Sequence, residues 1–144
     1  MFDLVYFKGI NGTQAIPIAL KAWLDLIQNG YSGNYLPLDD SINEAFVIFI
    51  KDKAVAISIF QKQENDTYLL DTTWIEPFYR GRKLYTVLWN KLKDHSKLNN
   101  IKRIISYTDI HNDIMRSIAK TQNRTEKEVN LDGEDVIELT FYIE

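Results

Sequence analysis

The sequence predicts one α+β domain over residues 1–144, a mixed, mostly antiparallel sheet flanked by helices in the order β-α-β-β-β-α-β-α-β. The length of 144 residues and the 45% share of hydrophobic residues suit a single globular domain with its own core. The apolar residues switch between helical spacing and period-two alternation, which indicates helices interleaved with strands. No segment repeats and none is rich in Pro, Gly or Ser, so we expect neither linkers nor a solenoid.

The first third of the chain predicts a strand, a helix and a loop. Residues 3–7 form the opening strand, which ends at a turn over residues 9–12, and residues 31–43 form the loop. Between them Thr13 is a suitable N-cap, and Pro17 is tolerated in the first turn of a helix. The apolar residues of this helix, which we expect to face the core, are Ile16, Leu20, Trp23, Leu24 and Ile27.

The middle of the chain predicts three strands that follow one another as a meander. Residues 46–50 and 54–60 are apolar runs joined by the polar turn 51–53. A second turn at residues 63–66 leads into the third strand, residues 67–75.

The C-terminal half predicts two helices and two further strands. Residues 101–107 form a strand, and residues 112–122 form a helix with Asn123 as a left-handed C-terminal stop. Residues 137–144 alternate between apolar and polar, which is typical of a half-exposed antiparallel strand. Before these elements lies a helix whose apolar residues recur at i, i+3, i+4 and i+8, namely Leu84, Val87, Leu88 and Leu92.

Composition argues against several classes of function. The chain has no Cys, which removes disulfides, thiolate nucleophiles and cysteine-ligated metals. Its two histidines, His95 and His111, belong to no metal-ligand spacing, so we expect no metal. No Gly-x-Ser-x-Gly is present for a serine hydrolase. The N-terminal Met1–Leu4 carries an acid and no apolar run could span a bilayer, so we expect a cytoplasmic protein without a membrane partner.

The most informative segment is Ile75–Tyr85, which places Arg80, Arg82 and Lys83 between the end of a strand and the first turn of a helix. Cations are disfavoured at a helix N-terminus, where unpaired N–H groups carry about half a positive charge. A bound anion would reverse that sign, and a phosphate or pyrophosphate is the natural candidate. The alternative is a solvated basic turn without a ligand.

The order of elements and the segment Pro-Phe-Tyr-Arg-Gly resemble the acetyl-CoA-binding motif of the GNAT superfamily of N-acyltransferases. In that family the loop reads Arg-Gly-x-Gly-x-Gly or Ala, and its backbone N–H groups hold the pyrophosphate of CoA. Arg80 and Gly81 match this pattern, whereas Lys83 and Tyr85 stand where small residues are usual. The resemblance implies acetyl-CoA as cosubstrate, bound by Trp74, Ile75, Arg80, Gly81, Arg82, Lys83, Leu84 and Tyr85.

The resemblance also suggests residues outside the loop. In the family an Asn that opens the following helix contacts the cofactor, and Asn112 matches it. Many relatives have a Tyr seven residues later as general acid, where this chain has Ala119. Amine acetylation needs a base for the ammonium proton. Asp71, on the same strand face as Ile75, is our first candidate, and Glu76, on the opposite face, is the second.

Three functions are compatible with these observations. The first is an acetyl-CoA-dependent N-acetyltransferase in which the primary amine of a small molecule or protein attacks the thioester directly. The second is a catalytically degenerate GNAT-fold binding or inhibitory module, favoured by the replaced glycines and Ala119. The third, a nucleic-acid-binding domain, is opposed by the net charge of −3. The basic residues available to nucleic-acid binding are Arg80, Arg82, Lys83, Lys102 and Arg103. The sequence leaves monomer and homodimer both open.

Overall fold

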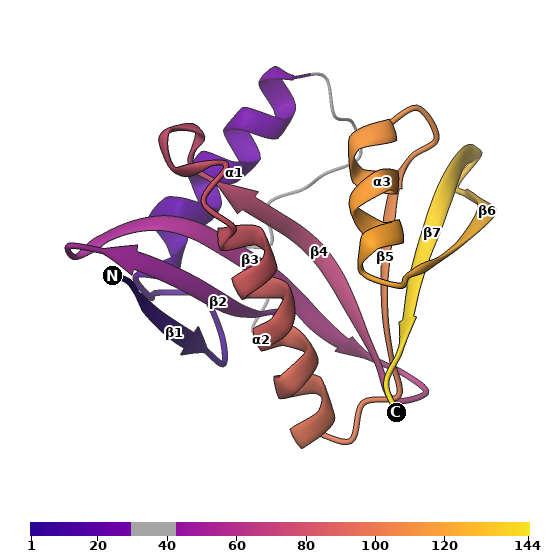
Figure 1. Ribbon diagram of the computed structural model, residues 1–144, viewed down its shortest axis with the longest axis horizontal. Coiled ribbons are helices and arrows are strands. Elements are labelled where there is room, and N and C mark those ends of the chain that lie inside the picture. The colour runs from indigo at the N-terminus through magenta and orange to yellow at the C-terminus, as the bar shows by residue number, and fades with distance from the viewer. Residues whose placement is uncertain (30–42) are drawn as a thin grey trace. The chain divides into compact units, whose positions relative to one another are not determined.

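The computed structural model describes residues 1–29 and 43–144 (Figure 1). The predicted order of elements is confirmed, and the structure adds one strand, β6, before the last one. The predicted loop at residues 31–43 lies, except for Asn43, outside the described residues. The helices and strands are β1 (Asp3–Phe7), α1 (Ala15–Gln28), β2 (Asn43–Ile50), β3 (Lys53–Gln63), β4 (Thr67–Ile75), the 3-10 turn η1 (Pro77–Tyr79), α2 (Leu84–Leu98), β5 (Arg103–Asp109), α3 (Asp113–Thr121), β6 (Thr125–Leu131) and β7 (Glu134–Tyr142).

The predicted fold class, a mixed and mostly antiparallel sheet with helices, is confirmed. The strand order is β1-β2-β3-β4-β5-β7-β6. The pairs β1/β2, β2/β3, β5/β7 and β6/β7 are antiparallel, and β4/β5 is parallel. The chain forms two compact units, Met1–Gln61 with Thr72–Leu92 and Lys62–Asp71 with Lys93–Glu144, which are described separately. That residues 1–144 form one domain stays a prediction.

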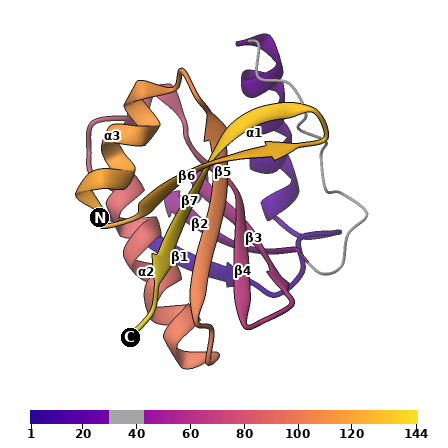
Figure 2. The same ribbon diagram turned by 90° about the vertical axis from the view of Figure 1, so that its right-hand side faces the viewer.

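In the first unit, β2 and β3 form a tight hairpin. Ile50 pairs with Lys53, so the turn consists of Lys51 and Asp52 alone, and both have positive φ. Two such residues make a type I′ turn, whose twist matches that of the flanking strands. The strands are buried on both faces, because α1 covers one face of this part of the sheet and the first half of α2 the other (Figures 1 and 2).

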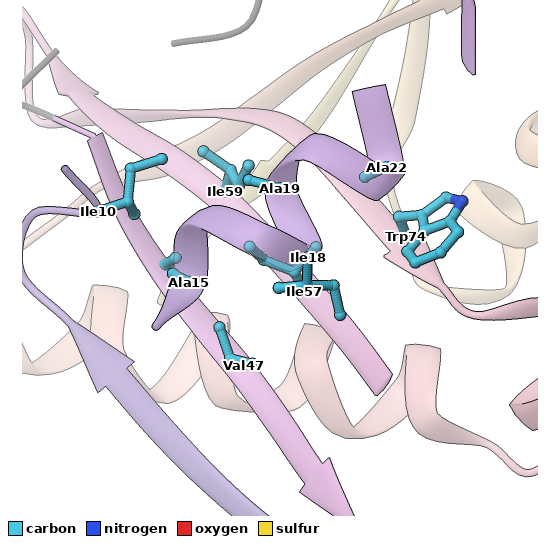
Figure 3. Close-up of a cluster of buried hydrophobic side chains, with 10 residues drawn as sticks. Ile10, Ala15, Ile18, Ala19, Ala22, Val47, Ile57, Ile59 and Trp74 are labelled. Atoms are coloured by element: carbon cyan, nitrogen blue, oxygen red, sulfur yellow. The ribbon is translucent and has the colours of Figure 1, made fainter. Parts of the chain in front are cut away.

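Helix α1 packs with a different face from the one we predicted. Its buried residues are Ala15, Ile18, Ala19 and Ala22, spaced i, i+3, i+4 and i+7, whereas Leu24 and Ile27 are 49% and 45% exposed. The inner face consists of three alanines and Ile18, and the small side chains let the helix lie close to β2 and β3 (Figure 3). The cluster contains Ile10, Ala15, Ile18, Ala19, Ala22, Ala45, Val47, Ile57, Ile59 and Trp74.

The prediction of Thr13 as the N-cap of α1 is wrong, because the N-cap position is Gln14, which makes no side-chain capping bond. The Thr13 Oγ1 accepts a hydrogen bond from the Ala15 N–H at 3.2 Å. Further along the first unit, the first half of α2 buries Leu84, Leu88 and Leu92, three of the four residues predicted for its apolar face.

The second unit contains the start of β4 and the strands β5, β7 and β6. Beyond the predicted elements, β6 forms a hairpin with β7 in which Leu131 pairs with Glu134 across the turn Asp132-Gly133 (Figure 2). Asn123 has φ 59°, which confirms it as the left-handed residue after α3. Ala119 packs with Ile137 and Leu139 in a small buried cluster.

Over the part of the chain that the structure describes, no helix is both long and apolar enough to cross a membrane.

Candidate functional site

The segment between β4 and α2 combines two left-handed residues with the N-terminus of a helix. Gly81 has φ 81° and Lys83 has φ 63°, so left-handed residues alternate with Arg82 just before α2 begins at Leu84. Where left-handed and right-handed residues alternate, successive N–H groups form a concave nest that favours anions, and the two left-handed residues make this segment a candidate for such a loop; Arg80, just before them, is extended, with φ −71° and ψ 154°. The first-turn N–H groups of α2, which have no acceptor within the helix, follow directly and add the positive end of its dipole.

The two left-handed residues explain the glycine pattern of the loop. A Cβ added at Gly81 would meet no atom within 4 Å, so Gly81 is needed for its φ and not for space. Lys83 adopts the same region although it carries a side chain, which costs about 1–2 kcal/mol in an L-residue. A glycine at position 83 would therefore relieve backbone strain.

Arg80 has structural partners that the basic segment alone does not reveal. Its Nε donates to the Ile75 carbonyl oxygen at 2.8 Å, and its Nη2 lies 3.4 Å from Asp25 Oδ2 on α1. Asp25 Oδ2 also accepts from Trp74 Nε1 at 2.8 Å. The guanidinium thus ties the start of the loop back to the end of β4 and to α1.

Arg82 and Lys83 are the loop cations available to a ligand. The Arg82 guanidinium carbon lies 5.3 Å from the ring centre of Phe78 and 5.1 Å from that of Tyr79, and the two rings pack edge to face. The Arg82 side chain is thereby held beside the loop. The Lys83 side chain is exposed and makes no ion pair with any residue of the described segments.

Glu76, our second candidate base, is engaged in ion pairs. Its carboxylate lies 3.1 Å from Lys53 Nζ and 3.7 Å from Lys21 Nζ, and its side chain is 19% exposed. Its N–H donates to the Val55 carbonyl at 2.8 Å. The Glu76 carboxylate thus connects Lys21 of α1 and Lys53 of β3 to the end of β4.

Asp71, our first candidate base, lies in the second unit where β4 leaves β5. The parallel register covers only the three pairs from Thr67↔Arg103 to Leu69↔Ile105, although both strands continue. Within this unit β5 pairs beyond Ile105 with β7 alone. Asp71 is exposed on this separated stretch.

The other predicted cofactor residues serve the fold with their side chains. Trp74 and Ile75 are buried, Trp74 in the cluster beneath α1, and the Ile75 carbonyl accepts from Arg80 Nε. Leu84 is buried as the first residue of α2, and Tyr85 is half-buried. Asn112 caps α3, its Oδ1 accepting from the Met115 N–H at 3.0 Å.

The structure places Asp25 and Phe78 at this loop, and the sequence did not single out either. Phe78 is 73% exposed. In the sequence, a large aromatic residue between Pro77 and a basic turn was the available signal. Asp25 gives no such signal, because it lies 55 residues from Arg80. No group of three or more His, Asp or Glu within residues 1–29 and 43–144 could hold a metal ion.

Comparisons with known proteins agree with the fold. The model of the acetyltransferase (GNAT) family matches residues 18–121. No curated protein matches the sequence. The solved structure of a GNAT-family acetyltransferase from Staphylococcus aureus Mu50 is similar, with a TM-score of 0.79 and 13% identity over 100% of both chains. The ribosomal-protein-S18-alanine N-acetyltransferase from Escherichia coli has a TM-score of 0.73 and 17% identity, over 99% of this chain and 94% of that one.

A third similar structure holds a cofactor. The PaiA N-acetyltransferase from Thermoplasma acidophilum, solved in complex with coenzyme A, has a TM-score of 0.69 and 14% identity, over 97% of this chain and 99% of that one.

Proposed function

The chain belongs to the acetyltransferase (GNAT) family, and we propose that it transfers an acetyl group from acetyl-CoA to the primary amine of a small molecule or protein. The observation that carries the proposal is the loop before α2, where Gly81 and Lys83 adopt left-handed conformations directly before a helix N-terminus. This arrangement suits a pyrophosphate, and CoA is a ligand that presents one together with a thioester.

Different groups of the loop would bind different parts of the cosubstrate. Backbone N–H groups from Gly81 to the first turn of α2 would bind the pyrophosphate, with Arg82 and Lys83 as charged partners. Arg80 fixes the start of the loop through its bonds to Ile75 and Asp25. In the family that the sequence resembles, free backbone groups of the strand before the loop pair with the pantetheine arm, and Thr73, Trp74 and Ile75 occupy that position here.

The proposed reaction is a direct transfer without a covalent enzyme intermediate. The acceptor ammonium gives a proton to a base, for which we propose Asp71, and the free amine then attacks the thioester carbon. A C–N bond forms, the C–S bond breaks, and the CoA thiolate takes a proton. After the C–N bond forms, the nitrogen still carries a second proton that the amide does not keep, and this proton balances the one that the thiolate takes up, directly or through solvent. Ala119 is fully buried and has no hydroxyl with which to relay it.

A binding or inhibitory module is the second candidate, because Lys83 replaces a glycine and no general acid stands at position 119. The two functions differ in one measurement, the release of free CoA thiol in the presence of an amine.

We also propose a cytoplasmic location for the protein.

The test has two stages. In the first, acetyl-CoA at about 100 times its dissociation constant should stabilise the protein by about 2.7 kcal/mol in thermal unfolding. Dephospho-CoA, which keeps the pyrophosphate, should retain most of this shift, and pantetheine, which lacks it, should give none. No shift with acetyl-CoA at millimolar concentration would refute both acetyl-CoA binding and the transferase.

In the second stage, polyamines, aminoglycosides, lysine peptides and peptides with a free N-terminal alanine are screened for thiol release. Release with one class of amine supports the transferase. A shift with acetyl-CoA but no release with any class would favour the binding module.

A further inference from the structure

Asp25 is the point at which three elements of the first unit meet. It lies on α1, and its Oδ2 accepts from Trp74 Nε1 at 2.8 Å and pairs with Arg80 Nη2 at 3.4 Å. Trp74 is buried on β4, and Arg80 opens the loop before α2. One carboxylate oxygen therefore connects a helix, a strand end and the anion-binding loop.

Arg80 makes a second hydrogen bond, to the strand that precedes the loop. With Nη2 on Asp25, Arg80 Nε donates to the Ile75 carbonyl at 2.8 Å, so the guanidinium bridges the strand that precedes the loop and the helix behind it. A side chain held at two of its nitrogens has little rotamer freedom left. The backbone of Arg80 is fixed with it, and the left-handed Gly81 follows directly.

From these contacts we infer that Asp25 is a positioning residue for acetyl-CoA binding: it holds Arg80 against Ile75 and thereby keeps the loop 80–83 in its anion-binding conformation. The inference rests on the proposed function for the identity of the ligand. Asp25 itself touches no ligand and acts through Arg80. A loop that is ordered before binding does not have to be ordered by the ligand, and the affinity is higher for that reason.

The test compares Asp25→Asn with Glu126→Gln. The Asn keeps the shape of Asp25 and an oxygen for Trp74 but loses the charge that holds Arg80. Glu126 pairs with Arg116 at 3.0 Å in the second unit, with a side-chain exposure of 29% close to the 32% of Asp25, so it controls for the loss of a comparable ion pair elsewhere. The dissociation constant of acetyl-CoA should rise about 3- to 10-fold in Asp25→Asn and stay within 2-fold in Glu126→Gln.

A double-mutant cycle then asks whether Asp25 acts through Arg80. In the Arg80→Gln background, Asp25→Asn should have no further effect on the dissociation constant. An equal loss in both backgrounds would overturn the inference, as would an unchanged dissociation constant in Asp25→Asn with a lowered melting temperature, which would leave Asp25 a structural residue only.

Amide hydrogen exchange of the free protein separates this inference from the proposed function. Peptides covering residues 76–84 should exchange faster in Asp25→Asn than in the parent protein, and no faster in Glu126→Gln. Faster exchange combined with no acetyl-CoA binding by the parent protein would refute the proposed function and leave the link between Asp25 and the loop standing. Unchanged exchange in this segment would overturn the positioning role whatever the ligand is.

Discussion

Replacing Lys83 by glycine should stabilise the protein, which is unusual for a substitution to glycine. Lys83 has φ 63°, a conformation that costs an L-residue about 1–2 kcal/mol and costs glycine almost nothing. Against this gain stands the larger backbone freedom of glycine in the unfolded chain, worth about 0.4–1 kcal/mol. The free energy of unfolding should therefore rise by about 0.8 kcal/mol at the middle of these ranges, which corresponds to a melting temperature higher by about 2–4 °C.

The measurement is urea unfolding of the ligand-free protein, followed by circular dichroism, with the midpoint and the slope fitted separately. Two controls accompany it. Lys91→Gly, at an exposed position within α2, should lower the free energy of unfolding by about 1 kcal/mol, because glycine is a poor helix former. Gly81→Ala should destabilise through φ 81° alone, since the added Cβ meets no neighbouring atom.

A loss of stability in Lys83→Gly comparable with that in Lys91→Gly would refute the reasoning, because the left-handed conformation would then cost nothing measurable. The same variant also tests the ligand role of the side chain. If Lys83 contacts phosphate, the more stable variant should bind acetyl-CoA more weakly; if it obstructs the loop, it should bind more tightly. Equal affinity would place the side chain in solvent.

Three further predictions concern other residues. Arg80→Ala should lower the free energy of unfolding by about 1 kcal/mol because it removes the bonds to Ile75 and Asp25, whereas Arg82→Ala should leave it within about 0.5 kcal/mol and reduce only the acetyl-CoA thermal shift; equal melting curves for the two would contradict this. Asp71→Asn should slow acyl transfer by about 10²- to 10⁴-fold near neutral pH with acetyl-CoA affinity retained, and the deficit should shrink as pH approaches the pKa of the amine; full activity at pH 7 would exclude Asp71 as base. Burial, and then Glu138, raise the pKa of Tyr107, so the stability that this phenol contributes is complete below pH 10 and is lost as pH rises through the raised pKa; Tyr107→Phe should unfold with a weaker pH dependence in that window, and an identical pH dependence would count against it.

The missed strand shows what hydrophobic spacing can and cannot predict. Strand β6 is an edge strand in which Glu126, Lys127 and Glu128 are exposed, so it lacks the apolar alternation that identified the other strands. Charged side chains on an edge discourage pairing with other molecules, and they also remove the sequence signal. The turn Asp132-Gly133 before the clear alternation of β7 was the available sign, because Asp-Gly is among the strongest short hairpin signals.

Our prediction of the inner face of α1 was wrong for a related reason. We assigned the inner face from Leu24, Ile27 and other large apolar residues, but Ala15, Ala19 and Ala22 lie against the sheet. A helix that lies close to a sheet needs small residues on its inner face. Alanine also favours helices at exposed positions, so alanines at helical spacing do not show which face is buried. The existence of the helix followed from local periodicity, whereas its orientation depended on partners in β2 and β3.

In the loop before α2, the sequence predicted the charges and the position but not the conformation. Lys83 adopts a left-handed backbone that its residue type disfavours, so the residue itself cannot be what sets the shape of the loop. The surroundings supply that shape: Arg80 is held by Ile75 on one side, and α2 begins at Leu84 on the other. Because Asp25, the other partner of Arg80, lies 55 residues away in the sequence, no local pattern contains this contact. The replaced glycine thus weakens the motif as a sequence signal while leaving the geometry in place, and a search that requires glycine at this position will overlook chains that form the same loop at the expense of some strain.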